Sequence, residues 1–261
     1  MVTLGNLAAQ TLYGFLEGII LGAVAAGLTL IWGIMKVVNL AHGHLAVLGA
    51  FLAVIVSMHY ASTGMIALSP IIAFLAGLGM GLIFYYASLH LIVGRAETMT
   101  LKVEMGSLLS TFGFGLGIYG FLFLASSWGW FPQYANVRHW SISVGGSTYF
   151  SIGGIAIQYN WLVPLAYALV MIAAAELFLR KTLWGIKMRA VAQDSRALAL
   201  TGEDPVRVKL LTSIISVGLA MMGGAIYALY NSSGINPDLE SQLAPLSFVI
   251  VVLGGLGSII G

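Results

Sequence analysis

Residues 18–35, GIILGAVAAGLTLIWGIM, decide the fold class because they form an unbroken apolar stretch. None of them carries a charge, and Lys36 follows directly after the stretch. A helix needs about 20 mostly apolar residues to cross the hydrocarbon core of a bilayer. The stretch therefore predicts a membrane-spanning helix, which begins near Thr11 if Glu17 lies toward its outer end.

The composition of the whole chain supports a membrane protein. Of the 261 residues, 59% are hydrophobic and 8% are charged, whereas a soluble domain has about 45–50% apolar and about 25% charged residues. The 11 basic and 9 acidic side chains are too few to coat a water-soluble surface, which excludes a soluble enzyme. The absence of cysteine excludes disulfides, thiolate metal sites and a cysteine nucleophile. The net charge of +2 gives no case for nucleic-acid binding.

Stretches without charge recur along the chain and predict an all-α polytopic integral membrane protein with about seven transmembrane helices. The predicted spans are 18–35, two spans within 37–94 that are separated by a polar turn at 57–64, then 105–125, 161–179, 210–230 and a last span from Leu243. The last span is still apolar at Gly261. We therefore expect a truncated C-terminus, with at least one further helix missing.

Basic residues predict the orientation, because loops that face the cytoplasm collect Lys and Arg. Seven of the 11 lie in the loop 180–209, and alternation through the predicted spans puts Lys36, Arg95 and Lys102 on the same side. This assignment places 10 of the 11 basic residues in the cytoplasm and leaves Arg138 outside. The N-terminus is then external.

The external connection 126–160 is the one long segment on its side of the membrane. Alternating polar and apolar side chains at 141–144 precede Gly145-Gly146. This pattern predicts a short hairpin or an irregular cap.

Glycines spaced four residues apart form two stripes, one at Gly14, Gly18 and Gly22 and the other at Gly113 and Gly117. Such stripes let helix backbones approach closely in membranes. We expect both stripes to be helix-packing surfaces; the alternative is that one of them borders a solute pathway.

Residues 37–44, VVNLAHGH, place polar and small side chains between two apolar helices. Polar groups at membrane depth are costly unless they line a cavity or find partners within the bundle. One interpretation is a tight cytoplasmic turn in which Asn39 and His42 cap helix ends. The other is a broken helix whose backbone and side chains border the solute path, as in many transporters. His42 and His44 have no acid near them in the sequence, so they do not predict a metal site.

Patterns that indicate catalysis do not occur in the sequence. It contains no G-x-x-x-x-G-K-[ST], H-E-x-x-H or G-x-S-x-G, which would mark a nucleotide, zinc or serine-hydrolase site. We therefore expect a transporter subunit rather than an enzyme, with no cofactor or metal bound by this chain. If ATP drives transport, another subunit binds the ATP.

The basic loop 180–209 has internal structure. Asp194 or Ser195 can cap a short helix that runs through Leu200, and Gly202 can end that helix. A bounded helix on the cytoplasmic face is more than a flexible linker.

Two interpretations of this short helix stay open, and in both the next span starts at 204–205, Asp-Pro. The helix belongs to a solvated loop that only sets topology, or it is a docking element. A docking element would fit a groove of a cytoplasmic partner through apolar residues such as Ala190, Ala197 and Leu198. It could then pass a rigid-body movement of the partner into the spans.

Three regions in order along the chain carry a resemblance to a known family. They are GLTLIWGIMKVVNLAHG at 27–43, GIKMRAVAQD at 185–194 with LTG at 200–202, and VVLGGLGS at 251–258 preceded by GINP at 234–237. These regions resemble the early motif, the cytoplasmic coupling loop and the late glycine-rich motif of the LivH-type permeases of branched-chain amino-acid ABC transporters. The resemblance covers the chain from near Leu12 to its end.

The resemblance implies a single transmembrane permease domain over 1–261, in the inner membrane of a bacterium. It implies a second, related permease subunit, two ATPase subunits that bind ATP and Mg, and a periplasmic solute-binding protein as partners. ATP hydrolysis in those partners would move branched-chain or other small amino acids or amides inward.

The resemblance also implies two sets of functional residues. By position, Asn39, His42 and Gly43 would lie at the broken segment beside the translocation pathway. The ATPase-coupling loop would contain Gly185, Lys187, Arg189, Ala190, Asp194, Arg196, Ala197, Leu198 and Gly202.

The cargo and the family pattern leave some points open. Ile259-Ile260 stand where the family continues with Ile-Pro, and Glu203-Asp204 replace a more usual Ile-Asn pair. The family also includes members for urea and short amides. The acids expected within the membrane are Glu17 and Glu176, and such apolar walls suit an aliphatic cargo. The alternative function is a self-contained channel or secondary transporter, which would need no docking helix in the basic loop.

Overall fold

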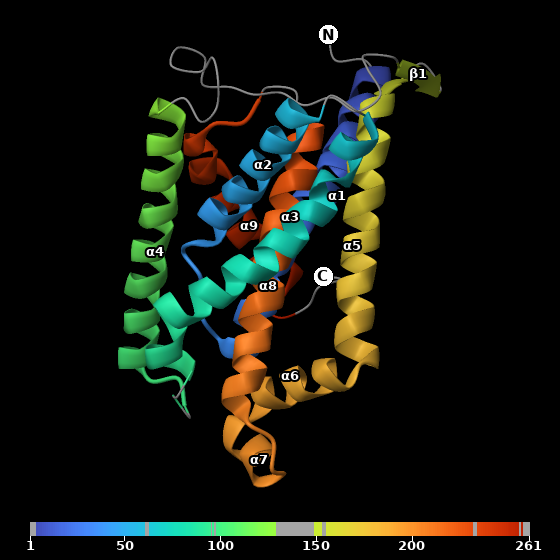
Figure 1. Cartoon of the computed structure of the whole chain (residues 1–261). Coiled ribbons are helices and arrows are strands. Elements are labelled where there is room, and N and C mark those ends of the chain that lie inside the picture. Colours follow the sequence, from blue (N-terminus) through green and yellow to red (C-terminus); the bar gives the residue numbers. More distant parts are fainter. Residues whose placement is uncertain are drawn as a thin grey trace.

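The structure is a computed structural model that describes residues 4–60, 63–94, 96, 98–128, 149–152, 155–231, 234–255 and 257. The described residues are mostly helical (Figure 1), as the apolar stretches predict. Arg95, Arg138, the predicted turn at 141–146 and the residues from Ser258 onward lie outside the described residues.

The long helices are α1 (Leu4–Met35), α2 (His42–His59), α3 (Thr63–Phe84), α4 (Leu101–Ser127), α5 (Leu162–Lys181) and α8 (Pro205–Tyr230). The π-helix η1 (Tyr85–Gly94) continues α3. Shorter elements are α6 (Leu183–Gln193), α7 (Ser195–Leu200), α9 (Glu240–Gly254) and the 3₁₀ turns η2 (Tyr159–Trp161) and η3 (Pro237–Leu239). The strands β1 (Tyr149–Ile152) and β2 (Ile155–Gln158) form an antiparallel hairpin in which Tyr149 pairs with Gln158.

The described residues contain 6 helices that are long and apolar enough to cross a membrane. They confirm an all-α polytopic membrane protein, but the predicted count of about seven spans is not confirmed. The stretch predicted to start a seventh span at Leu243 forms α9, which has 15 residues. A helix of that length is about 22 Å long, which is shorter than the hydrocarbon core.

Helix α8 is the centre of the bundle, and α1, α2 and α3 pack around it (Figure 1). Glycines permit this packing because their missing side chains let two backbones meet. A Cβ atom on Gly224 of α8 would lie 1.7 Å from the carbonyl oxygen of Ala46 in α2, and one on Gly49 would lie 2.0 Å from that of Met221. The crossing of α2 and α8 therefore depends on glycine at both positions.

The two predicted glycine stripes have a different role from these buried glycines. A Cβ atom on Gly14, Gly18, Gly113 or Gly117 would meet nothing within 4 Å, and one on Gly22 would only reach a side-chain methyl at 4.0 Å. The prediction that both stripes are close-packing surfaces is therefore wrong for the packing within this chain. Glycines spaced four residues apart identify a helix face that lacks side chains. The spacing does not identify which helix, if any, packs against that face.

The two ends of the bundle differ. At one end α6 runs from α5 toward α8, with α7 beyond it, and the β-hairpin and the start of α1 lie at the opposite end (Figure 1). Tyr13 Oη in α1 donates a hydrogen bond to the Ala156 carbonyl oxygen of the hairpin at 2.7 Å. These ends are called the α6–α7 end and the hairpin end below.

Candidate functional site

The polar segment between α1 and α2 runs from the end of α1 back into the interior of the bundle. Helix α1 ends at Met35, and Lys36 adopts a left-handed backbone with φ of 56°. His42 Nε2 then donates to the Val24 carbonyl oxygen at 3.0 Å. Val24 precedes Met35 by 11 residues, which is about 16 Å along a helix. Helix α2 therefore begins deep inside the bundle, as in a broken helix, rather than after a turn at the surface.

The residues that precede α2 are held by polar contacts inside the protein. Asn39 is 2% exposed, and its Oδ1 accepts from Ala41 N at 3.0 Å. Leu40 N donates to Thr111 Oγ1 of α4 at 3.2 Å. Within the described residues, Asn39 Nδ2 and His42 Nδ1 are buried without a hydrogen-bond partner. These two nitrogen atoms are therefore available to form hydrogen bonds with a group that is not among the described protein atoms.

Gly43 lies where α2 meets the first turn of α9. A Cβ atom on Gly43 would lie 2.6 Å from the Ala244 Cβ. This close approach brings the starts of α2 and α9 together although about 200 residues separate them in the sequence.

Two acidic residues at the start of α9 form contacts that the sequence did not predict. Glu240 Oε2 lies 3.7 Å from His44 Nε2, and Tyr119 Oη donates to Asp238 Oδ1 at 2.9 Å. His44, which has no acid near it in the sequence, therefore has an acidic neighbour in the fold. Glu240 follows the GINP motif at 234–237, and only the fold brings it to His44 in α2.

The basic loop folds into two helices rather than one. Thr182 Oγ1 accepts from Gly185 N at 3.0 Å and starts α6, a helix that the sequence analysis missed. Asp194 Oδ1 accepts from the backbone N–H groups of Arg196 and Ala197 at 2.8 and 3.2 Å and starts α7. The predicted cap at Asp194 is confirmed.

The end of α7 also agrees with the prediction. Helix α7 ends at Leu200, and Gly202 follows with a left-handed φ of 85°, a conformation that favours glycine. Asp204 Oδ1 then accepts from Val206 N at 2.9 Å and caps α8, in which Pro205 occupies the first turn.

The two short helices have distinct inner and outer faces. Gly185, Met188 and Val191, spaced three residues apart in α6, are buried against the bundle, as is Leu198 of α7. The exposed members of the predicted coupling set are Arg189, Asp194, Arg196, Ala197 and Gly202. Lys187 forms an ion pair with Glu203 at 2.7 Å, and Ala190 is half-buried against the core.

Leu200 is the most exposed apolar side chain of these helices, at 90%. It lies on α7 with the exposed Ala197. Sequence reasoning did not single out Leu200 as a docking residue. A protruding leucine beside exposed arginines is an anchor suited to a partner groove.

A buried lysine in α8 joins that helix by hydrogen bonds to the segment that follows α3, near the α6–α7 end of the bundle. Lys209 Nζ in α8 donates to the carbonyl oxygens of Val93 at 3.1 Å and Ala96 at 2.7 Å. A cavity of about 440 Å³ lies beside Lys209 and is also lined by Lys36 and Arg196. The connections that carry Lys36, residue 96 and the basic loop thus meet at one end of the bundle.

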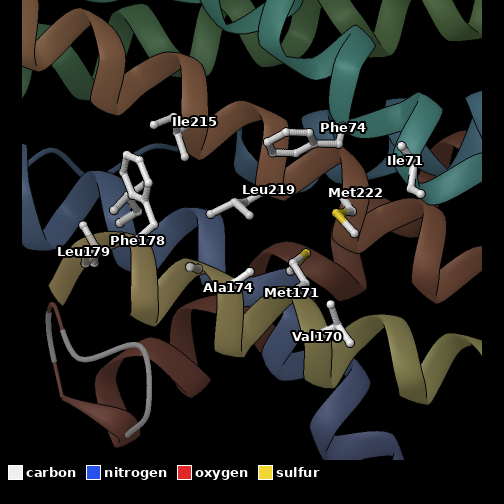
Figure 2. Close-up of a pocket in the computed structure, with 12 residues that line it drawn as sticks. Ile71, Phe74, Val170, Met171, Ala174, Phe178, Leu179, Ile215, Leu219 and Met222 are labelled. Atoms are coloured by element: carbon white, nitrogen blue, oxygen red, sulfur yellow. The ribbon is translucent and has the colours of Figure 1, made fainter. Parts of the chain in front are cut away.

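A second cavity, of about 430 Å³, lies among α1, α3, α5 and α8 (Figure 2). Its lining side chains are all apolar, and Figure 2 shows Phe74, Phe178 and Leu219 around it. Such a lining offers no hydrogen bond or charge to a polar solute. Polar and charged side chains lie instead near the starts of α2 and α9.

Known proteins are similar to this chain over most of its length. A family model described as "Branched-chain amino acid transport system / permease component" matches residues 10–261. The high-affinity branched-chain amino acid transport system permease protein BraD of Pseudomonas aeruginosa is 24% identical, over 97% of this chain and 80% of BraD. The LivH permease proteins of the corresponding systems of Salmonella typhimurium and Escherichia coli K12 are 26% identical, over 98% of this chain and 83% of each LivH. No solved structure matches the chain.

Proposed function

The chain belongs to the branched-chain amino acid transport permease family, whose members are membrane subunits of ABC importers, and we propose that its cargo is a branched-chain or other small amino acid or amide. In this proposal the chain is one permease domain over 1–261 in the inner membrane of a bacterium. ATP hydrolysis in separate subunits drives the cargo inward.

The proposed partners are two ATPase subunits, a second related permease and a periplasmic solute-binding protein. ATP and Mg are bound by the ATPase subunits in this assembly, since the sequence has no Walker motif. The proposed ATPase contact is the α6–α7 pair. The support for this contact is that the loop forms two helices, which are capped by Thr182 and Asp194. A loop that only sets the topology would not need to form capped helices.

The proposed orientation puts the α6–α7 end in the cytoplasm and the N-terminus outside. Its support is the concentration of basic residues at that end, where Lys36, Arg196 and Lys209 line one cavity. The β-hairpin then lies on the periplasmic side, where the solute-binding protein delivers the cargo.

The observation that carries the transport proposal is the deep start of α2. A helix that begins about 16 Å inside the bundle exposes backbone polar groups, which a membrane protein tolerates only where they are buried in protein or line a water-filled path. Asn39, His42 and Gly43 are accordingly proposed to border the translocation pathway. Membership of the importer family favours this assembly over a self-contained channel or secondary transporter.

ATP-driven uptake tests the proposed function. Proteoliposomes that hold the purified complex, with ATP enclosed and leucine-loaded solute-binding protein outside, should accumulate labelled leucine. Replacing ATP by a non-hydrolysable analogue should stop accumulation. Leucine uptake at the same rate in both preparations would instead indicate a channel or a secondary transporter, and parallel vesicles with labelled urea test the amide alternative.

Bulky side chains in the broken segment should block transport. Asn39→Phe and His42→Phe place rings where the native side chains are 2% exposed, so uptake should fall to the level of vesicles without the complex. The ATPase subunits should still copurify, since α6 and α7 are unchanged. Leu40→Phe is the control, because Leu40 is 38% exposed in the same segment. Normal uptake by the Asn39 and His42 variants would contradict a role in the pathway and leave this segment as a turn that only connects α1 to α2.

A further inference from the structure

Lys209 fixes the beginning of α8 to the end of η1. Its side chain is buried, and Nζ donates to the carbonyl oxygens of Val93 and Ala96 at 3.1 and 2.7 Å. These two carbonyl groups lie in the last turn of η1 and just beyond it, where the carbonyl oxygens of a helix have no partner within the helix and carry partial negative charge. A buried ammonium group is costly unless its donors are paired. The contact therefore satisfies both sides and holds η1 in place on α8.

A second hydrogen bond joins the same two elements. Tyr85, the first residue of η1, is 1% exposed, and its Oη donates to the Val206 carbonyl oxygen at 3.3 Å. Val206 and Lys209 are three residues apart in α8, so they lie on the same face of that helix. Each end of η1 is thus bound to the beginning of α8.

The beginning of α8 is itself attached to the proposed ATPase contact. Helix α7 ends at Leu200 and α8 begins at Pro205. Glu203, in the connection between them, forms an ion pair with Lys187 of α6 at 2.7 Å, and Asp204 caps α8. Because this connection is short and held at both sides, a displacement of α6 and α7 would move the beginning of α8.

Helix α4 joins η1 to the broken segment. Ser110 Oγ in α4 donates to the Ser88 carbonyl oxygen of η1 at 2.9 Å. The next residue, Thr111, accepts from Leu40 N of the broken segment through Oγ1 at 3.2 Å. Helix α4 begins at the α6–α7 end (Figure 1), and Thr111 follows its first residue, Leu101, by 10 residues, which is about 15 Å along the helix. Neighbouring residues of one helix therefore contact η1 and the segment deep inside the bundle.

We propose that Lys209 is a positioning residue for transport, which passes a displacement of α6 and α7 through η1 and α4 to the broken segment at Leu40. Packed helices that are joined by hydrogen bonds transmit such a displacement as a rigid-body shift. The inference rests on the proposed ATPase contact and on the proposed pathway, and it adds the route that connects them. This route is called the Lys209 link below.

The test compares the amount of leucine imported for each ATP hydrolysed in the reconstituted complex, with saturating leucine-loaded solute-binding protein. Lys209→Met keeps an unbranched side chain and removes the donor. The ratio of uptake to hydrolysis should fall by about fivefold or more. The rate of ATP hydrolysis and the copurification of the ATPases should stay close to those of the wild type, because α6 and α7 are unchanged.

Ser110→Ala interrupts the Lys209 link at a later contact and changes the side chain less. Loss of this one hydrogen bond should lower the ratio by about twofold or more. The double variant should lose no more than Lys209→Met alone, since two breaks in one link are not additive. If Lys209→Met yields no complex, Ser110→Ala still tests the link.

Each variant has a matched control. Ser126→Ala also removes a hydroxyl from α4, but Ser126 Oγ donates to the Leu122 carbonyl oxygen of the same helix at 2.8 Å. Lys181→Met removes a positive charge from an exposed position at the end of α5. Both controls should keep the wild-type ratio. The unfolding temperature of every variant separates a loss of stability from a loss of coupling.

Two results would overturn the Lys209 link. A wild-type ratio in Lys209→Met and Ser110→Ala would leave direct packing of α8 against α2 as the route. Uptake and ATP hydrolysis that fall together with the unfolding temperature would show that Lys209 only stabilises the fold. The proposed function fails in a different way, if the wild-type complex does not accumulate leucine at all.

Discussion

Glutamate at Ala197 and Leu200 is expected to stop ATP hydrolysis from driving uptake, while the protein stays inserted in the membrane. Leu200 is 90% exposed and Ala197 is exposed beside it on α7. Burying one leucine in a partner groove contributes about 1.5–3 kcal/mol, and a carboxylate in an apolar groove adds a desolvation penalty. Uptake should therefore fall by at least about 10-fold.

The control for this prediction is Thr98→Glu, which adds one negative charge at an exposed polar position of the same end, outside α6 and α7. It should retain uptake. Ala190→Glu is a poorer test, because Ala190 is half-buried against the bundle and its replacement would disturb packing within the chain. Unchanged uptake by the Ala197→Glu, Leu200→Glu variant, measured with ATP hydrolysis in proteoliposomes, would contradict docking through α7.

Gly224→Ala is expected to prevent the bundle from forming a stable core. The added Cβ would lie 1.7 Å from the Ala46 carbonyl oxygen, so α2 and α8 would have to separate along their whole crossing. Overpacking of this kind costs about 1–3 kcal/mol and more where backbone must move, which is a large part of a typical stability of about 5–15 kcal/mol. Thermal unfolding of the purified protein should shift to lower temperature, with a lower yield of folded protein.

Gly117→Ala is the matched control, since both changes improve helix propensity equally and a Cβ on Gly117 would meet nothing within 4 Å. Its unfolding temperature should equal or exceed that of the wild type. A Gly224→Ala protein as stable as the Gly117→Ala protein would contradict the close crossing of α2 and α8.

The positions of the spans could be predicted because hydrophobic length is a local property. The predicted stretch 105–125 lies within Leu101–Ser127, and 161–179 overlaps Leu162–Lys181. The break at 57–64 matches the gap between His59 and Thr63. The caps at Asp194 and Asp204 were equally local, since a side chain that accepts from N–H groups two or three residues ahead is visible in the sequence.

Features that depend on which helices meet could not be predicted in this way. Gly224 and Gly49 are among the glycines that permit close packing, but nothing local distinguishes them from Gly113. The contact between His44 and Glu240 joins residues 196 positions apart, so no spacing rule could find it. The start of α2 was also ambiguous in sequence, because the same polar residues suit a surface turn and a buried break.

The central claim, that this chain is the permease subunit of an ABC importer, is tested most directly by its stoichiometric partners. The full-length protein would be tagged, extracted gently from its native membrane and analysed with its copurifying proteins by mass spectrometry. We expect two ATPase chains and a second related permease for each complex. A homo-oligomer without any ATPase would contradict the claim and leave the self-contained channel or secondary transporter as the function to test.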